Sequence, residues 1–389
     1  MSKEIRAVIG FLKPNSKDFP GESRVFLPSD ISLLTQAFHA HPLIWSGHQM
    51  PNHSQKEYLQ IPNIQIESSD EPIISTSDMI ISLKHPSELL INLMKPGQVL
   101  VTMAHFHTRP GRIEKYIKKG IRVISMDSII DEKGNRIVQD LKGVAWNGIR
   151  ALFDYAEQYT DKCKLLKRDC LNILILGSGG VGIHAVNAAR YLGDKERKNR
   201  LGRSIPIIVT SVGSDVTSNP FLLNSLLKST DVLVDATNRI DPTTAIIENH
   251  HLVALPPHAA IVDLASDYYD PFSGLNRTMV KAIEGIPTGD GSQYIFSPDD
   301  LHNEDSIPKD VPHDNRRLTL SHGSWPALDP EGSMQTYGRQ LIPLLIAMAG
   351  LNRDPLAAYD LLSKDSPDPR IRTLFTGTLT SFLKAKENE

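Results

Sequence analysis

The chain has 389 residues, of which 40% are hydrophobic and 22% are charged, and its formal net charge at pH 7 is −3. This composition is typical of an ordinary globular protein with two domains. The near-neutral charge gives no support for nucleic-acid binding, and no apolar run approaches the roughly 20 residues that a membrane-spanning helix needs.

The cysteines and the N-terminus bear on location. The only cysteines, Cys163 and Cys170, fit no metal-ligand spacing, and such sparse use suits a reducing compartment. The opening residues, MSKEIRAVIGF, lack the apolar segment and cleavage site of a secretory signal. We therefore expect a cytoplasmic protein without a metal site, which binds neither nucleic acid nor membrane.

The first third of the chain alternates apolar runs with helical segments. Short apolar runs predict buried strands, and Pro28 opens a predicted helix. The predicted strands are residues 5–12, 43–45, 79–83, 99–104 and 122–124, and the predicted helices are 28–38 and 113–119. This alternation indicates a parallel α/β sheet.

Polar side chains recur near the ends of these strands. Lys84 and His105 follow two of them, and Arg24 lies in the loop after the first. Ligands of open α/β sheets bind beyond the carboxyl ends of the strands, so these three side chains are expected to converge there. Taken singly, each is more often a solvated surface residue.

A second domain is expected after a connecting helix. Residues 144–159 carry apolar side chains at helical spacing. Residues 335–349 and the tail from 355 also have helical patterns, and the tail is expected to return to the first domain. The predicted first domain therefore comprises residues 1–143 and 336–389, and the second comprises 144–335.

The most specific motif lies within residues 171–189, LNILILGSGGVGIHAVNAA. A strand pattern precedes it and a helix pattern follows it, the context that a dinucleotide site requires. Gly177 allows a tight turn, Gly179 lets the backbone approach a pyrophosphate, and Gly182 lets the helix pack close to the strand. The predicted cofactor contacts match G-x-G-x-x-G and are Gly177, Ser178, Gly179, Gly180, Val181 and Gly182. A glycine turn without a ligand is the alternative.

The next strand bears on the choice between NAD and NADP. It is predicted over residues 205–209, and an NAD site usually carries an acidic residue at its end. Thr210, Ser211 and Gly213 stand there instead, and Asp215 comes later. Ser211 is therefore a candidate cofactor contact, and we expect NADPH to be accepted at least as well as NADH.

Two further strands are predicted at residues 232–235 and 260–264. Asp267 follows the second, where a carboxylate would meet a nicotinamide and a substrate. The alternative for Asp267 is an aspartate that caps a turn or a helix.

Taken in order, these motifs resemble the family of alanine dehydrogenases, saccharopine dehydrogenases and carboxyethylornithine synthases. The segments that carry the resemblance are FPGESRV at 19–25, SLK at 82–84, MAH at 103–105 and ASD at 265–267. FPGE at 19–22 and DEKGNRIV at 131–138 favour the saccharopine and carboxyethylornithine branches. The stretch SWP at 324–326 departs from the loop that the family has near its end.

The resemblance implies two Rossmann-like, doubly wound α/β domains with a cleft between them, in an NAD- or NADP-dependent oxidoreductase. It implies that Arg24 binds a substrate carboxylate and that Arg136 lies near the same site. Lys84 and His105 would share acid–base work, and Asp267 would stand beside the nicotinamide. The reaction would be reductive amination of a 2-oxo acid by an amino acid, of the saccharopine or opine type, in a homo-oligomer.

Two alternatives stay open. Within the same class, the protein is a plain alanine dehydrogenase. In another class, it is a non-catalytic protein that binds a nucleotide, since a fold does not by itself imply a function. The pair Lys84 and His105 argues against that second alternative, because a binding module has no need of proton-transferring groups.

Overall fold

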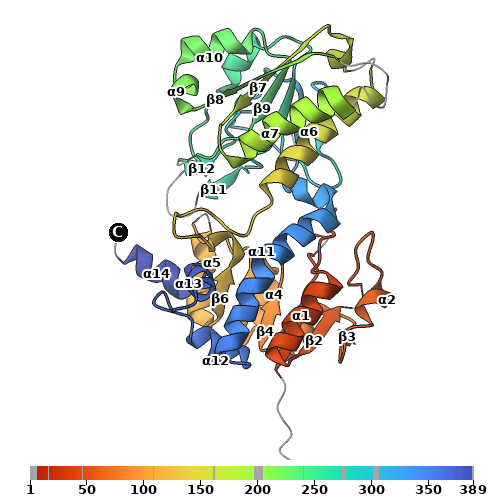
Figure 1. Cartoon of the computed structure of the whole chain (residues 1–389). Coiled ribbons are helices and arrows are strands. Elements are labelled where there is room, and N and C mark those ends of the chain that lie inside the picture. The colour runs from red at the N-terminus through yellow and green to blue at the C-terminus, as the bar shows by residue number, and fades with distance from the viewer. Residues whose placement is uncertain are drawn as a thin grey trace, which may run out of the picture. The chain divides into compact units, whose positions relative to one another are not determined.

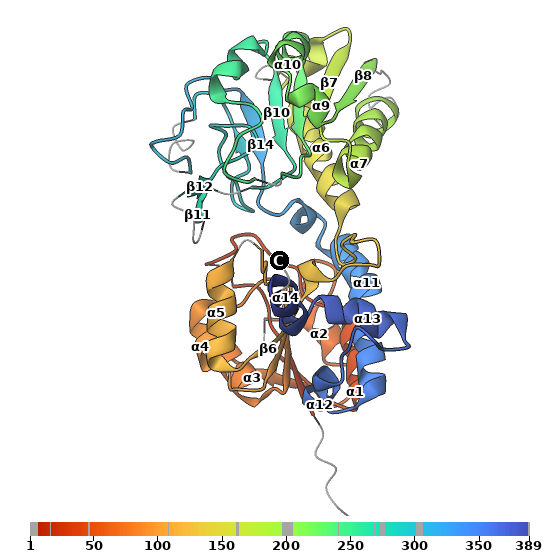
Figure 2. The same cartoon turned by 90° about the vertical axis from the view of Figure 1, so that its left-hand side faces the viewer.

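The computed structural model describes residues 7–15, 17–45, 47–107, 109–160, 163–196, 205–239, 241–267, 269–272, 277–300 and 306–387. The chain forms two compact units (Figures 1 and 2): unit 1 comprises residues 1–140 and 330–389, and unit 2 comprises residues 141–329. The chain returns to unit 1 at residue 330, whereas the sequence predicted residue 336. Helix α11 (Pro330–Leu351), which belongs to unit 1, begins at Pro330, and proline suits the first position of a helix.

The sheet of unit 1 has the strand order β3-β2-β1-β4-β5-β6, and all its neighbouring strands are parallel. This is the doubly wound order: the chain crosses to the other half of the sheet after β3, and the switch point lies between the neighbouring strands β1 and β4. The sequence predicted every strand except the short β3. The strands are β1 (Val8–Phe11), β2 (His41–Trp45), β3 (Gln65–Glu67), β4 (Met79–Ile81), β5 (Val99–Thr102) and β6 (Arg122–Ser125).

Helices cover both faces of this sheet (Figure 2). Successive side chains of a strand point to opposite faces, and here both sets are apolar, so both faces must be buried. Ile81 of β4 packs into the core under α1, α11 and α13, whereas its neighbour Ile80 packs into the core under α3, α4 and α5. The remaining helices of unit 1 are α1 (Pro28–Phe38), α2 (Gln55–Tyr58), α3 (Asp70–Thr76), α4 (Glu88–Leu93), α5 (Pro110–Lys119), α12 (Pro355–Asp360), α13 (Pro369–Thr376) and α14 (Leu379–Lys386), with a 3₁₀ turn η1 (Met126–Ser128).

The sheet of unit 2 has the order β13-β14-β10-β9-β7-β8 and is parallel except for β13. The chain crosses to the other half of the sheet after β8, and the switch point lies between the neighbouring strands β7 and β9, again a doubly wound arrangement. The strands are β7 (Leu171–Leu176), β8 (Ile207–Val212), β9 (Val232–Asp235), β10 (Ala260–Asp263), β13 (Ile295–Phe296) and β14 (Leu318–Ser321). A separate antiparallel pair is formed by β11 (Asp270–Phe272) and β12 (Arg277–Met279).

Helices α6 and α7 cover one face of the second sheet, and α10 lies on the other (Figure 1). The helical elements are α6 (Leu141–Gln158), α7 (Gly180–Arg190), α9 (Ser214–Thr217) and α10 (Pro220–Leu227), the 3₁₀ turns η2 (Lys164–Lys167), η4 (Asn249–Ala254) and η6 (Trp325–Leu328), and the π turn η3 (Tyr191–Glu196). The predicted fold class, two Rossmann-like α/β domains, is confirmed by these two sheets.

The second strand predicted for unit 2, residues 205–209, is wrong in its bounds. The strand expected to end at residue 209 is β8, which continues to Val212 and pairs with β7 along its whole length. β8 is an edge strand with several exposed residues, so the polar Thr210 and Ser211 do not end it.

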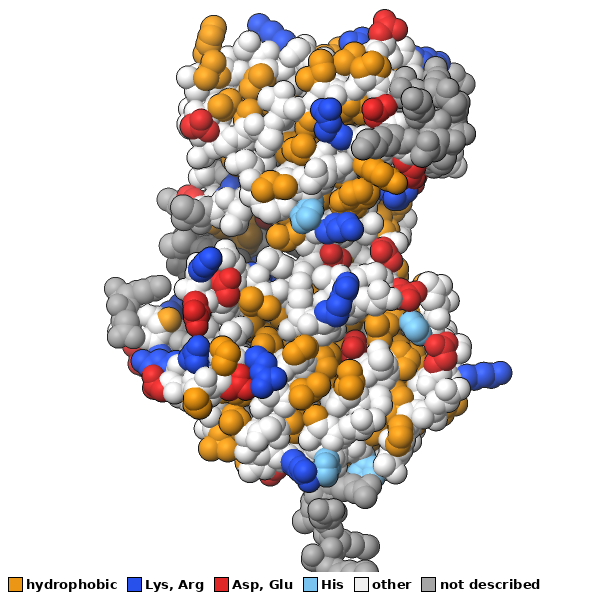
Figure 3. Space-filling model, viewed as in Figure 1, with side chains coloured by type: hydrophobic (Ala, Val, Ile, Leu, Met, Phe, Trp, Pro, Cys, Tyr) orange, Lys and Arg blue, Asp and Glu red, His pale blue; other side chains and the backbone are white. Residues whose placement is uncertain are grey.

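The surface and the helices add two observations. On the face drawn in Figure 3, Lys and Arg side chains are interspersed with Asp and Glu rather than gathered in one patch of a single sign. Among the helices that the structure describes, none combines the length and the apolar character needed to cross a bilayer.

Candidate active site

Lys84 and His105 occupy corresponding positions on neighbouring strands of unit 1. Lys84 is the third residue after Ile81, the end of β4, and His105 is the third residue after Thr102, the end of β5. The two strands pair in parallel. Both residues therefore lie at the carboxyl edge of the sheet, next to the switch between β1 and β4, where doubly wound sheets bind ligands.

Arg24 reaches the same edge from the loop after β1, and its partner there is Glu22. Nε of Arg24 donates to Oε1 of Glu22 at 2.9 Å and Nη2 donates to Oε2 at 2.6 Å, a bidentate ion pair. Nη1 donates to Oγ of Ser333 at 3.1 Å. The Arg24 side chain is only 2% exposed. The guanidinium predicted to bind a substrate carboxylate is thus directed at a carboxylate of the chain itself.

This ion pair sets the charge environment of Lys84. Nζ of Lys84 lies 3.7 Å from Oε2 of Glu22 and 5.4 Å from the ring centroid of Phe19, and the side chain is 18% exposed. Burial, reinforced by repulsion from Arg24 and opposed by Glu22, lowers the pKa of Lys84 to about 8. Burial alone would raise the pKa of Glu22, but Arg24 and Lys84 lower it to about 2. Lys84 therefore exchanges its proton near neutral pH beside a permanently charged carboxylate.

His105 is oriented by Asp127. Nδ1 of His105 lies 3.3 Å from Oδ2 of Asp127, and the backbone N–H of His105 donates to Oδ1 at 3.2 Å. Ser125 also donates to that carboxylate at 2.7 Å. Burial raises the pKa of Asp127, but His105, Ser125 and Arg136 lower it below its usual range. With Nδ1 facing the carboxylate, the other ring nitrogen of a half-exposed imidazole is available for proton transfer.

Arg136 belongs to this second group rather than to the Glu22–Arg24 pair. Its Nε donates to the carbonyl oxygen of Val138 at 2.9 Å, and Nη2 lies 3.9 Å from Sδ of Met103. Met103 is two residues from His105, so the guanidinium lies close to the His105–Asp127 pair and contributes to the low pKa of Asp127.

Several residues of this site were not predicted from the sequence. Glu22 stands two positions before Arg24, and Asp127 follows β6 at the same edge as Lys84. The rule that polar residues after strands converge would have identified Asp127. Ser333 carries no such signal, because it lies on α11 and is 309 positions from Arg24 in the chain.

The glycine loop of unit 2 has the geometry of a phosphate site. Gly177 has a φ of +101°, and a Cβ there would lie 2.4 Å from the carbonyl oxygen of Ala236. A Cβ on Gly182 would lie 2.0 Å from the carbonyl oxygen of Gly177. In contrast, a Cβ on Gly179 would meet no described atom within 4 Å. The fold requires glycine at 177 and 182, whereas the space over Gly179 is what the close approach of a pyrophosphate needs.

The helix after this loop presents its amino end to the same place. α7 begins at Gly180, and its N-cap residue is Gly179, which has no side chain to accept hydrogen bonds from the first N–H groups. Those N–H groups and the positive end of the helix dipole attract phosphate. The residues Ser178, Gly179 and Gly180 are exposed. The predicted glycine motif therefore fits the phosphates of a dinucleotide.

The corrected end of β8 changes the surroundings of Ser211 and Asp215. Ser211 lies within the strand, and its Oγ donates to the carbonyl oxygen of Gly177 at 3.3 Å. Asp215 lies in the first turn of α9, and its Oδ1 is 2.9 Å from where a Cβ of Gly213 would stand. A carboxylate is thus present three residues beyond the end of β8, which weakens the reason for expecting NADPH at least as readily as NADH.

Asp267 lies at the carboxyl edge of the second sheet, in the loop after β10. Its carboxylate forms an ion pair with Arg239, and its side chain is 29% exposed. Burial raises the pKa of Asp267, and the Arg239 guanidinium opposes part of this rise. The sequence did not predict the partner, Arg239.

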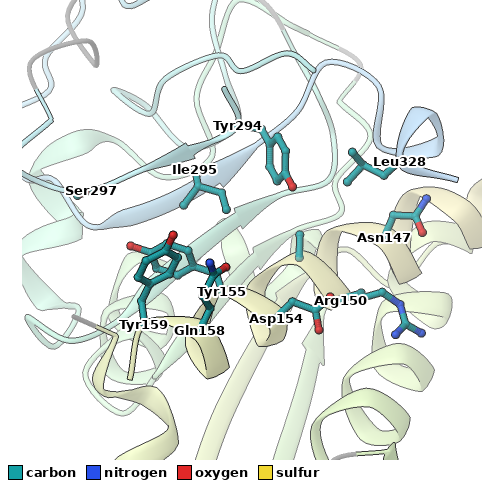
Figure 4. A pocket seen from close by; sticks show the side chains of 11 residues that line it. Asn147, Arg150, Asp154, Tyr155, Gln158, Tyr159, Tyr294, Ile295, Ser297 and Leu328 are labelled. Carbon is teal, nitrogen blue, oxygen red and sulfur yellow. The ribbon is translucent and has the colours of Figure 1, made fainter. Parts of the chain in front are cut away.

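Unit 2 also carries a pocket of about 550 Å³ between α6 and β13 (Figure 4). Tyr155 of α6 and Tyr159, which directly follows that helix, lie together at one end of it, and Arg150 lies at the other. Arg150 is already paired with Glu196 at 2.9 Å. None of the residues predicted to form the site lines this pocket.

The sequence matches known proteins over much of its length. Residues 18–145 match the family model described as alanine dehydrogenase/PNT, N-terminal domain. An alanine dehydrogenase of Methanococcus maripaludis is 24% identical over 244 residues, which are 59% of this chain and 63% of that protein. The NAD(P) transhydrogenase subunit alpha of Haemophilus influenzae is 23% identical over 300 residues, 69% of this chain and 53% of that protein. The matched stretches thus span less than two thirds of either relative.

Solved structures resemble the chain in fold. An L-alanine dehydrogenase superimposes with a TM-score of 0.65 at 16% identity, over 95% of this chain and 99% of that one. The transhydrogenase from Sinorhizobium meliloti superimposes with a TM-score of 0.59 at 15% identity, over 88% of this chain and 95% of that one. At such identities the likeness concerns the fold.

Proposed function

We propose that this chain belongs to the alanine dehydrogenase/PNT family, whose N-terminal domain model matches residues 18–145, and that it is a nicotinamide-dependent oxidoreductase that acts on the C–N bond of an amino acid or a secondary amine. The observation that carries the proposal is the lowered pKa of Lys84, about 8, which lets this side chain carry a proton near neutral pH. It lies at the carboxyl edge of a doubly wound sheet, beside the Glu22–Arg24 pair.

Unit 2 supplies the cofactor site in this proposal. The backbone of the glycine loop and the amino end of α7 would hold the pyrophosphate, and Asp215 would accept hydrogen bonds from ribose hydroxyls. A carboxylate there repels the extra phosphate of NADP, so we propose that NADH is preferred to NADPH. When bound, the nicotinamide supplies the acceptor or donor of the hydride.

The residues of unit 1 move the protons. Neutral Lys84 accepts a proton from the amine as hydride leaves the substrate carbon, and the ammonium form returns a proton to the nitrogen in the reverse direction. Glu22 holds the positive form of Lys84 in place, and Arg24 limits its basicity. A second proton must be moved when water adds to the imine and when the amine is expelled. His105, oriented by Asp127, carries this proton.

Carboxylate binding by Arg24 and Arg136 remains part of the proposal. Both guanidiniums lie at the carboxyl edge of the same sheet, and arginine pairs with carboxylates through two parallel hydrogen bonds. For Arg24 this contact would be made in addition to the one with Glu22.

The test is oxidation of NADH or NADPH in the presence of a 2-oxo acid and an amine, followed by the absorbance of the reduced nicotinamide. The 2-oxo acids are pyruvate and 2-oxoglutarate, and the amines are ammonia, lysine and ornithine. Turnover with ammonia supports the alanine dehydrogenase type, which the named relatives favour. Turnover only with lysine or ornithine supports the saccharopine or opine type. Tight NADH binding without turnover of any pair would contradict the proposal and favour a non-catalytic nucleotide-binding protein.

A further inference from the structure

Lys281 is a buried lysine with a specific set of partners. Its side chain is 1% exposed, and Nζ donates to Oδ2 of Asp263 at 2.6 Å and to the carbonyl oxygen of Asp267 at 2.7 Å. An ammonium removed from water is costly unless it is paired and hydrogen-bonded. Position 281 thus holds a cation that is bonded to the last residue of β10 and to the loop after it, with a longer contact of 3.4 Å to Oγ of Ser321 in β14.

The carboxylate of Asp263 holds the same loop from its other end. Its Oδ1 accepts the backbone N–H of Ser266 at 3.0 Å, and Oδ2 accepts Oγ–H of Ser321 at 2.9 Å in addition to Lys281. Ser266 has a φ of +58°, in the left-handed region that a serine rarely adopts. The loop therefore keeps an unfavourable backbone conformation because Asp263 and Lys281 bind it at both ends.

The side chain of Asp267 is held as well. Its carboxylate pairs with Arg239, whose Nη2 also donates to the carbonyl oxygen of Val280 at 2.6 Å. Val280 is adjacent to Lys281 in the chain. Asp267 is thus fixed through its carbonyl oxygen by Lys281 and through its carboxylate by Arg239.

The place of this network in the sheet indicates what it serves. Asp263 lies in register with Asp235 of β9 and Ser321 of β14, all at the carboxyl ends of parallel strands. A doubly wound sheet binds a dinucleotide across its switch point, with one nucleotide over each half. The glycine loop and Asp215 lie on the β7–β8 side. The nicotinamide nucleotide therefore belongs over β9 and β10, where Asp267 stands.

We propose that Lys281 is a positioning residue, which acts through Asp263 and the carbonyl oxygen of Asp267 to hold Asp267 against the nicotinamide half of the dinucleotide. This inference rests on the proposed function. It concerns a residue outside the four sequence segments that carry the resemblance to dehydrogenases, residues 19–25, 82–84, 103–105 and 265–267.

The test compares two ligands that differ only in the nicotinamide. NADH carries it, and ADP-ribose has the same adenosine, pyrophosphate and second ribose without it. The dissociation constants of both are measured by calorimetry for the full chain and for Lys281→Met. We expect NADH to bind at least about ten times more weakly to the variant and ADP-ribose to change less than about threefold. The fluorescence of bound NADH should also shift toward that of free NADH.

Two further variants separate positioning from stability. Arg317→Met removes another cation of unit 2 that holds backbone carbonyls, those of Leu252, Leu255 and Pro256, at the amino end of β14. It should lower the melting temperature without changing the ratio of the two dissociation constants. Lys281→Met combined with Asp263→Asn avoids an unpaired buried carboxylate, and it is measured in the same way if the single variant does not fold.

The outcomes are distinguishable. Equal weakening of NADH and ADP-ribose in the Lys281 variants would mean a purely structural role, and unchanged binding of both would also overturn the inference. If the unaltered protein binds neither NADH, NADPH nor ADP-ribose, the proposed function itself fails.

Discussion

Asp235 should make the stability of unit 2 depend on pH. Its carboxyl is buried at the end of β9, opposite Asp263 of β10. Burial, with repulsion from Asp263, raises the pKa of Asp235 to about 7. A folded-state pKa above the unfolded value favours folding while the group is protonated. That stabilisation is present below about pH 4 and is lost as the pH rises through about 7.

The size of the effect follows from the shift. An unfolded aspartate has a pKa of about 3.9, so the pKa of Asp235 rises by about three units on folding. Each pKa unit corresponds to about 1.4 kcal/mol, so the ionised carboxyl lowers the free energy of unfolding by on the order of 4 kcal/mol above pH 7. Asp235→Asn should remove this cost, because an amide cannot ionise. Its oxygen can still accept the bonds that Thr237 makes to Oδ1 from its backbone N–H at 3.0 Å and its hydroxyl at 2.7 Å. We therefore expect Asp235→Asn to gain about 2–4 kcal/mol of stability relative to the parent at pH 8.

The assay is urea unfolding between about pH 5 and pH 8, where the change is expected. In a Trp45→Phe background the remaining tryptophans, Trp146 and Trp325, both belong to unit 2, so their fluorescence reports its unfolding. The variant should gain stability relative to the parent as the pH rises. Asp263→Asn is the contrasting variant and should destabilise at every pH, because it leaves Lys281 without its carboxylate. Parallel pH profiles for Asp235→Asn and its parent would refute the reasoning.

The remaining predictions concern the two candidate sites. Lys84→Met should abolish most turnover and leave NADH binding intact, since Lys84 lies in unit 1. His105→Gln should slow turnover by roughly a hundred to ten thousandfold, the usual range for one acid–base group, and the double variant should be little worse than Lys84→Met. Glu22→Gln removes the anion that raises the pKa of Lys84, so the rate–pH profile should move to lower pH. Gly179→Ala should leave the melting temperature nearly unchanged but weaken NADH binding about tenfold or more, about 1.4 kcal/mol, whereas Gly182→Ala should destabilise the fold.

Each of these outcomes has a result that contradicts it. Near-normal turnover of Lys84→Met with the true substrate, or loss of its NADH binding, would remove Lys84 from the chemistry. An unmoved rate–pH profile in Glu22→Gln would separate Glu22 from the titration of Lys84. If Gly179→Ala binds NADH normally by calorimetry, no pyrophosphate approaches that residue.

Features that depend on neighbours along the chain could be predicted from the order of the residues. Strands buried on both faces of a parallel sheet are continuous apolar runs, so β1, β4, β5, β7, β9 and β10 could be recognised from composition alone. The glycine motif is equally local, because Gly177 and Gly182 are required by contacts within one strand–turn–helix unit and the strand beside it. The resemblance to dehydrogenases followed from these motifs in order.

Only the tertiary structure decided which side chains are paired and how basic they are. Arg24 is a positive charge in any sequence-based argument, but its hydrogen bond to Ser333 of a distant helix and the burial that lowers the pKa of Lys84 arise only in the folded chain. The same holds for Lys281, whose partners Asp263 and Asp267 lie in another segment. The end of β8 was missed for a related reason: an edge strand pairs through its backbone, so its polar residues do not reveal where it stops. Hydrogen bonding and desolvation depend on residues that are close in the folded chain and often distant in sequence, so a local sequence pattern does not predict them.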